Sequence, residues 1–190
     1  MTPTPAARIG LIGGGNIARA HLRGYAALGS AARVTALADT DPETLATRTA
    51  ETGATGYSDY RQLIADPEVD AVDICLPHHL HHDAIVAAAQ AGQHLLVEKP
   101  LCLTAEEARS VRAAVADSGV TLMCAHNKLY LPAVAKAKEL VDSGALGTST
   151  GCAPPMSSST TSTPRPWAGA PTRRPPGEGN TSTPATTPPT

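Results

Sequence analysis

Small residues at the end of an apolar run could cradle a phosphate group. Gly13, Gly15 and Ala18 stand in the spacing G-x-G-x-x-A. In this pattern the first glycine permits a tight turn, and the second lets the backbone approach a pyrophosphate. The third small residue lets a helix pack closely on a strand. The N–H groups of Asn16 and Ile17 would then face phosphate oxygens from a helix N-terminus. The alternative is a glycine-rich turn that binds no ligand.

A carboxylate follows where a dinucleotide site would hold its ribose. Asp39 ends the next apolar run, 21 residues after Ala18. An acid at about this spacing accepts hydrogen bonds from the ribose hydroxyls and repels a 2′-phosphate. Thr40 and Asp41 come next, where an arginine would favour NADP. These residues predict NAD as the cofactor in preference to NADP. The alternative for Asp39 is a helix cap before Pro42.

The elements that must position these residues alternate regularly along the chain. Five short apolar runs are separated by longer segments of helical spacing. The runs are residues 9–12, 34–38, 71–76, 94–97 and 120–124, and the helical segments are 16–28, 42–52, 80–91, 104–118 and 131–143. Thr104 and Glu107 fit a capping box, and Gly92 and Gly119 are expected helix stops. Runs that are apolar throughout indicate a sheet covered on both faces. We therefore expect an α/β fold, a doubly wound parallel sheet of Rossmann type over residues 8–147.

Two further stretches place polar residues just after predicted strands. One runs from Leu76 through Pro77 into a cluster of histidines, and the other contains Glu98 and Lys99. Ligands bind at the carboxyl ends of the strands in open parallel sheets. The alternative for Lys99 is a solvated lysine at the end of a strand. The cluster consists of His78, His79, His81 and His82. We expect at least two of these four side chains to be exposed at the start of a helix.

The overall composition restricts the remaining classes of function. A net charge of −2 and a pI of about 6.4 attract neither nucleic acid nor an anionic membrane. No apolar run is as long as a membrane span, and the N-terminus does not resemble a signal peptide. The four cysteines have neither C-x-x-C nor zinc-finger spacing. We therefore expect free thiols, a cytoplasmic location and no metal site.

With the glycine loop, these stretches resemble the Gfo/Idh/MocA family of oxidoreductases over nearly all of residues 8–147. The tripeptide Glu-Lys-Pro at residues 98–100 is the family's most specific mark. His81 matches the family's histidine in P-x-x-x-H, and residues 126–132 match a segment that often reads H-N-x-R-F-x-P. Leu129 departs from that pattern because arginine is frequent at its position.

The resemblance implies roles for these residues. Lys99 would be catalytic, near the nicotinamide and the reacting hydroxyl, and Glu98 would contact the nicotinamide ribose. Leu76, Pro77 and His81 would belong to the cofactor site. The implied activity is NAD(P)-dependent oxidation or reduction of a sugar, inositol or similar polyol, by a protein that forms homo-oligomers in its intact form. Members of the family also carry a second domain, whose histidine usually acts as the general acid/base. We expect this chain to be the nucleotide-binding domain with that substrate domain missing. Two alternatives stay open: a dinucleotide sensor without catalysis, and an inactive product of the gene.

Residues 148–190 differ in character from the domain before them. Ser, Thr and Pro occupy 27 of these 43 positions, and Val, Ile and Leu are absent. Such a composition predicts disorder, as it does for the leader at residues 1–7. The codons of residues 166–190 can be read in a shifted frame, with the third base of each codon joined to the first two bases of the next. The residues that this frame permits include the pattern G-G-G-x-x-x-D-x-G-x-H, which is typical of the family's second domain. We therefore expect a frameshift after Gly147, and the alternative is an authentic disordered tail.

Overall fold

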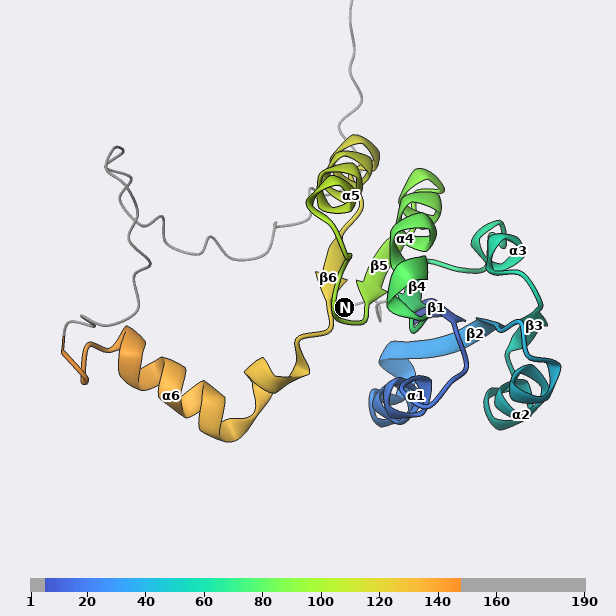
Figure 1. Ribbon diagram of the computed structural model, residues 1–190. Helices are drawn as coiled ribbons and strands as arrows, with labels where there is room; N and C mark the ends of the chain where they lie inside the picture. Colours follow the sequence, from blue (N-terminus) through green and yellow to red (C-terminus); the bar gives the residue numbers. More distant parts are fainter. Residues whose placement is uncertain (1–5, 148–190) are drawn as a thin grey trace, which may run out of the picture. The chain divides into compact units, whose positions relative to one another are not determined.

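A computed structural model describes residues 6–147 (Figure 1). The predicted tail and most of the predicted leader lie outside these residues. Every element below belongs to the unit Met1–Ala145. Within the described part, no helix is both long and apolar enough to cross a membrane.

Six parallel strands form one sheet in the order β3-β2-β1-β4-β5-β6 (Figure 1). The strands are β1 (Ala7–Ile12), β2 (Ala32–Ala38), β3 (Thr55–Tyr57), β4 (Ala71–Ile74), β5 (His94–Val97) and β6 (Leu122–Cys124). The order reverses between β1 and β4, so the loops that leave these two strands diverge and open a crevice at their carboxyl ends. The predicted doubly wound sheet is confirmed.

Helices cover both faces of this sheet, which explains why its strands are apolar throughout. On one face Leu11 and Leu37 pack with α1 and α2, and on the other Ile12, Ile74 and Val97 pack with α3, α4 and α5 (Figure 1). A sixth helix follows β6. The helices are α1 (Ala18–Ala27), α2 (Pro42–Thr52), α3 (Tyr60–Ile64), α4 (His81–Gln90), α5 (Ala105–Ser118) and α6 (Pro132–Asp142).

Local sequence signals account for several helix ends. Thr104 and Glu107 form the predicted capping box, and Gly119 ends α5 with a φ of 69°. At the start of α2, Asp41 is the N-cap and its carboxylate accepts a hydrogen bond from the Thr44 N–H at 2.9 Å. The alternative interpretation of Asp39 as this cap is therefore wrong.

Two elements, β3 and α3, were not expected from the sequence. The strand has three residues and the helix has five. Elements this short do not complete enough periods for an apolar pattern to identify them. Five predicted boundaries also differ by two residues. The structure has β1, α1, β2 and β6 begin at residues 7, 18, 32 and 122, and β4 end at residue 74.

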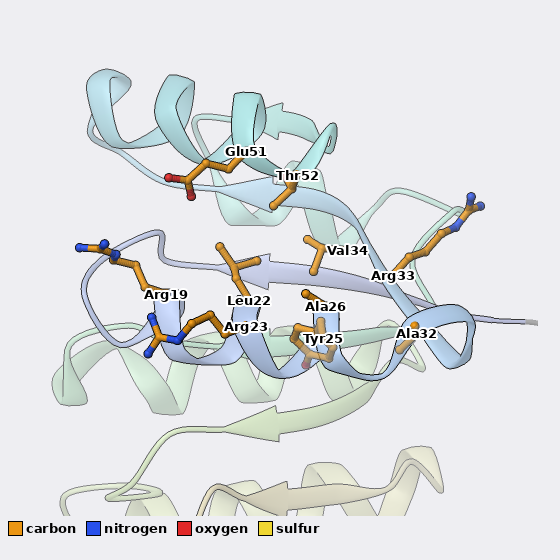
Figure 2. A pocket seen from close by; sticks show the side chains of 11 residues that line it. Arg19, Leu22, Arg23, Tyr25, Ala26, Ala32, Arg33, Val34, Glu51 and Thr52 are labelled. Atoms are coloured by element: carbon orange, nitrogen blue, oxygen red, sulfur yellow. The ribbon is translucent and has the colours of Figure 1, made fainter.

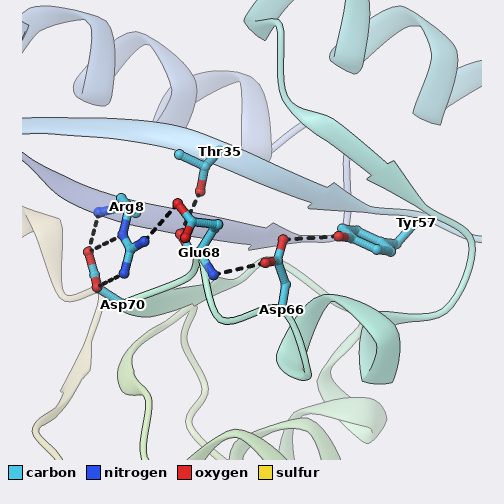
Figure 3. A network of polar contacts seen from close by, with 6 residues as sticks. All are labelled: Arg8, Thr35, Tyr57, Asp66, Glu68 and Asp70. Carbon is cyan, nitrogen blue, oxygen red and sulfur yellow. Dashed lines mark hydrogen bonds and ion pairs between the residues drawn. The ribbon is translucent and has the colours of Figure 1, made fainter.

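A polar network ties β1 to the segment before β4 at the amino ends of the strands (Figure 3). The Arg8 guanidinium donates to the Asp70 carboxylate at 2.7 Å and lies 2.9 Å from that of Glu68. The Thr35 hydroxyl donates to the Glu68 carbonyl at 3.3 Å. These exposed ion pairs add little stability, and they lie at the opposite end of the sheet from the glycine loop.

Candidate functional site

Two of the three glycines in the loop between β1 and α1 are explained by different features of the structure. Gly13 has a φ of 92°, and a Cβ there would lie 2.6 Å from the Cys75 carbonyl oxygen. Only glycine fits this turn. A Cβ on Gly15 would meet nothing within 4 Å. The protein's own packing therefore does not require Gly15, whereas a ligand that approaches the backbone would. This bare position fits a bound pyrophosphate.

The start of α1 offers backbone donors beside this position. The N-cap residue Ile17 makes no side-chain capping bond, and the first helical turn contains no acidic residue. The first N–H groups of any helix lack intrahelical acceptors. Asn16 and Ile17 are exposed there, so their amides can bind an anion, as the motif predicts. Ala18 is fully buried, which matches the close helix-to-strand packing expected at the third position.

Asp39 lies directly against the glycine loop at the end of β2. Its Oδ2 accepts a hydrogen bond from the Gly14 N–H at 2.7 Å, and its Oδ1 accepts one from the Asp41 N–H at 2.8 Å. An ionised carboxylate has about four acceptor sites, so two remain for further donors such as ribose hydroxyls. The Asp39 carboxylate therefore lies beside the glycine loop with acceptor capacity left for a ligand.

Arg48 on α2 is a loop contact that sequence reasoning missed. Its Nε donates to the Gly14 carbonyl at 2.9 Å, and its guanidinium pairs with Glu51 at 2.8 Å. A cation beside Asp39 could in principle hold a 2′-phosphate. Here the guanidinium is already engaged by a backbone carbonyl and a carboxylate. Its position on α2 could have indicated this contact, since one face of the helix must lie against the glycine loop.

A cavity of about 360 Å³ joins these parts at the crevice between β1 and β4. Five residues singled out from the sequence line it: Gly13, Gly15, Asp39, Leu76 and Pro77. Ser58 and Tyr60 also line it, and they were missed because the β3–α3 region was not predicted. Asn16, Ile17, His81, Glu98 and Lys99 are not among the lining residues.

A second cavity, of about 530 Å³, lies along α1 beside β2 and α2. Figure 2 shows Leu22 and Val34 between α1 and the strand, with Arg19 and Arg33 extending away from each other at its two ends. This cavity contains none of the residues that the motifs identify. The smaller cavity is therefore the candidate site.

His81 connects the loops that follow β4 and β5. The side chain is fully buried, with Nδ1 2.8 Å from the Pro100 carbonyl oxygen and Nε2 2.9 Å from that of Leu76. Its ring therefore holds the two loops together from behind the cavity. His78 and His79 are exposed, as expected for at least two members of the cluster. The cluster does not form a metal-ligand set among the described residues.

The Glu-Lys-Pro turn presents its lysine to solvent and its glutamate to the interior. Lys99 is exposed at the end of β5, and the Lys99–Pro100 peptide bond is cis. Glu98 keeps only 7% of its surface exposed, and its Oε2 accepts a hydrogen bond from the Lys99 N–H at 3.0 Å. The glutamate thus stabilises the turn that carries Lys99.

A buried polar cluster behind this turn has no sequence motif and was missed. The His21 ring on α1 lies between the carboxylates of Asp73 and Glu98, and the Tyr25 hydroxyl donates to Asp73 at 2.9 Å. The hydrogen bond with Asp73 raises the pKa of His21 to about 8, although burial opposes the shift. Burial raises the pKa of Tyr25 and of the Cys75 thiol.

Ligand-type atoms of His21, Asp73 and Cys75 lie within 4.8 Å of one another, the one such group in the described part of the chain. The His21 ring lies 2.7 Å from Asp73, and the Cys75 thiol donates to the same carboxylate at 3.7 Å. These groups satisfy one another without an ion, so we do not assign a metal here. Cys75, Cys102 and Cys124 are free thiols, as expected.

Comparison with known proteins identifies the family of the chain. Residues 7–126 match GFO_IDH_MocA, an oxidoreductase family with an NAD-binding Rossmann fold. Levoglucosan dehydrogenase from Pseudarthrobacter phenanthrenivorans is 40% identical over 147 residues, which cover 73% of this chain and 38% of that protein. Inositol 2-dehydrogenase from Rhizobium meliloti is 35% identical over 143 residues, with coverage of 74% and 42%.

A solved structure leads to the same comparison. Levoglucosan dehydrogenase in complex with NADH and levoglucosan superposes with a TM-score of 0.71 at 38% identity, over 75% of this chain and 40% of that one. The chain therefore spans about two fifths of the length of the relatives it matches.

Proposed function

The chain belongs to the Gfo/Idh/MocA oxidoreductase family, and on this basis we propose that it binds NAD(H) to oxidise or reduce a sugar, inositol or similar polyol. One observation carries the proposal. The bare backbone at Gly15 and the carboxylate of Asp39 line the same cavity, so a pyrophosphate and its adenosine ribose would each meet a matching group. The nucleotide-binding domain comprises residues 8–147 in this proposal.

In this proposal each residue of the site contacts a different part of the dinucleotide. Gly13 shapes the turn, and the amides of Asn16 and Ile17 bind the phosphates. Asp39 accepts hydrogen bonds from the ribose, with NAD preferred over NADP because a 2′-phosphate would meet its charge. Leu76 and Pro77 provide the apolar wall toward the nicotinamide end.

The turn after β5 provides the catalytic group in this proposal. A bound nicotinamide would supply the chemistry of hydride transfer to or from the substrate carbon. Lys99 orients the reacting hydroxyl through its ammonium group and assists proton movement at Nζ. Glu98 contributes to the nicotinamide ribose region while it holds the Lys99 N–H. His81 fixes the loops that present these groups.

A dinucleotide sensor is a second candidate function, which one observation favours. All residues that line the cavity come from the stretch between Ile12 and Leu80, so binding requires only the described part of the chain. A sensor needs the glycine loop and the acid but has no use for Lys99. Turnover of a polyol that Lys99→Ala abolishes would therefore favour the enzyme.

The test is titration of the full chain with NADH and NADPH, followed by fluorescence. We expect NADH to bind more tightly, and Gly15→Val to bind at least a hundredfold more weakly because the side chain fills the pyrophosphate position. Arg109→Gln, on the exposed surface of α5, is the matched control and should bind as the native chain does. Equal NADH affinity in the Gly15→Val variant would refute the site.

The location and assembly of the protein belong to the same proposal. We place it in the cytoplasm, where free thiols such as Cys75 persist. A homo-oligomer is the proposed assembly state. Size-exclusion chromatography with light scattering would measure that state directly.

A further inference from the structure

The polar cluster behind the Glu-Lys-Pro turn connects α1 to the turn itself. His21 on α1 has Nδ1 2.7 Å from Asp73 Oδ2 and Nε2 3.2 Å from Glu98 Oε1. Asp73 is fully buried, and the side chain of His21 is 12% exposed. Neither His21 nor Asp73 lines the dinucleotide cavity, so the function proposed above does not use them.

The geometry of His21 fits the charged form of its ring. Each ring nitrogen faces a carboxylate oxygen, and an ionised carboxylate can only accept a hydrogen bond. A neutral imidazole carries one N–H, so one of its two contacts would place a lone pair against a carboxylate. The imidazolium donates to both Asp73 and Glu98 and removes this conflict.

Glu98 transmits the position of His21 to the catalytic turn. Its Oε1 faces the ring, and its Oε2 accepts the hydrogen bond from the Lys99 N–H. One carboxylate therefore joins α1, which begins at the phosphate loop, to the backbone of Lys99. If the His21 ring moves away from Glu98, the carboxylate loses its hydrogen bond to the ring. The turn that contains Lys99 is then less restrained.

We propose that His21 is a positioning residue, which in its charged form holds Glu98 and thereby keeps the Glu98–Pro100 turn in the arrangement that receives the nicotinamide end of the dinucleotide. This inference rests on the proposed function. It makes dinucleotide binding depend on the proton of His21, because the neutral ring no longer donates to both carboxylates.

The groups that face His21 allow one change of charge in the relevant pH range. Asp73 and Cys75 face it from β4, Glu98 from the end of β5, and Tyr25 from its own helix, through Asp73. Burial raises the pKa of Cys75 and of Tyr25, so both stay neutral in the range tested. The pKa of His21, about 8, falls within it.

The first experiment measures NADH affinity of the full chain by fluorescence between pH 6.5 and pH 9. With a pKa of about 8, the charged fraction of His21 falls about tenfold between pH 7 and pH 9. Because the neutral form should bind about tenfold more weakly than the charged form, the affinity should fall about fivefold over the same range. His21→Gln should bind about tenfold more weakly at pH 7 and show no such dependence, since its amide does not titrate, carries no charge and has both of its donors on one nitrogen, whereas the two carboxylates face different nitrogens of the imidazolium. A native affinity that does not change with pH would overturn the inference.

Two further variants separate positioning from a general effect on the fold. Asp73→Asn removes the main cause of the raised pKa, so the midpoint of the pH dependence should move toward 6.5. His82→Gln is the matched control, because His82 contacts the exposed carboxylate of Asp83 at 2.8 Å on α4. It should retain the native profile. An unchanged midpoint in Asp73→Asn would refute the role of His21.

A measurement on the native chain covers the case in which a variant does not fold. NMR titration of the histidine rings should show one that titrates near pH 8, with its midpoint raised further by saturating NADH. A midpoint that NADH leaves unchanged contradicts the inference. Binding that occurs at every pH with equal strength defeats this inference alone, whereas no binding at any pH defeats the proposed function as well. Stoichiometric Zn²⁺ binding that is lost in Cys75→Ser would assign the cluster to a metal and also overturn it.

Discussion

Gly13 and Gly15 stand two positions apart in one motif, yet their substitution should have opposite consequences. Gly13→Ala should destabilise the fold, because its φ of 92° disfavours a side chain and its Cβ would lie 2.6 Å from the Cys75 carbonyl oxygen. Gly15→Val should leave the fold intact, because its Cβ would meet no protein atom within 4 Å. The same variant should abolish dinucleotide binding, because the side chain would fill the pyrophosphate position.

The magnitudes follow from these contacts. A non-glycine residue in left-handed backbone costs about 1–2 kcal/mol, and the backbone overlap at Gly13 adds about 1–3 kcal/mol. The expected loss for Gly13→Ala is therefore about 2–5 kcal/mol, a large share of the stability of an ordinary domain. Gly15→Val should change stability by about 0.5 kcal/mol or less. A hundredfold loss of NADH affinity in that variant equals about 2.7 kcal/mol of binding free energy.

Urea denaturation followed by circular dichroism measures the first quantity, and NADH fluorescence titration measures the second. Both variants should be compared with the native chain in one buffer. The reasoning fails if Gly13→Ala unfolds at the native urea concentration. It also fails if Gly15→Val loses stability and affinity together, because the position would then serve the fold.

Three further predictions concern other parts of the chain. Asp39→Ala should narrow the preference for NADH over NADPH, since the ribose acceptor and the repulsive charge vanish together; parallel titrations check this, and a wider preference contradicts it. Because the pKa of His21 rises from 6.5 to about 8 on folding, its contribution of about 1–2 kcal/mol should be fully present below pH 6.5 and be lost as pH rises through 8. Urea titrations of the native chain across that range, with His21→Gln as the flat reference, measure it. Gly10→Ala should destabilise the fold, since its Cβ would lie 2.5 Å from the fully buried Leu63, and Leu63→Ala should cost about 2–5 kcal/mol. The double variant Gly10→Ala/Leu63→Ala should lose less free energy of unfolding than the two single variants lose together. Losses that simply add would argue against the contact.

Features with a local cause could be predicted from the sequence. Helix α2 spans Pro42–Thr52 as expected, because Asp41 caps its start and Gly53 ends it in left-handed backbone. The glycine loop and Asp39 lie together because a strand, a turn and a helix in succession bring them to one edge of a parallel sheet. Position along the chain was sufficient information in both cases.

The polar cluster could not be predicted, because its members are distant in sequence. His21 lies 52 positions from Asp73 and 77 from Glu98. Asp73 stands inside an apolar strand, where nothing nearby indicates a partner. Such contacts depend on how helices and strands pack, whereas periodicity reports only which face of an element is apolar. For the same reason the sequence did not show that Glu98 and His81 face inward.

The place of β1 at the centre of the sheet has a consequence for synthesis of the chain. β1 pairs with β2 on one side and β4 on the other, and Arg8 and Asp70, which face each other near that second pair, are 62 positions apart. At roughly 5–20 residues per second, about 3–12 seconds separate their emergence from the ribosome. During that time one backbone edge of an apolar strand has no partner within the nascent chain, and unpaired edges promote aggregation. Slow codons before residue 71 would lengthen this exposure, so translation speed in that stretch should affect the yield of folded protein.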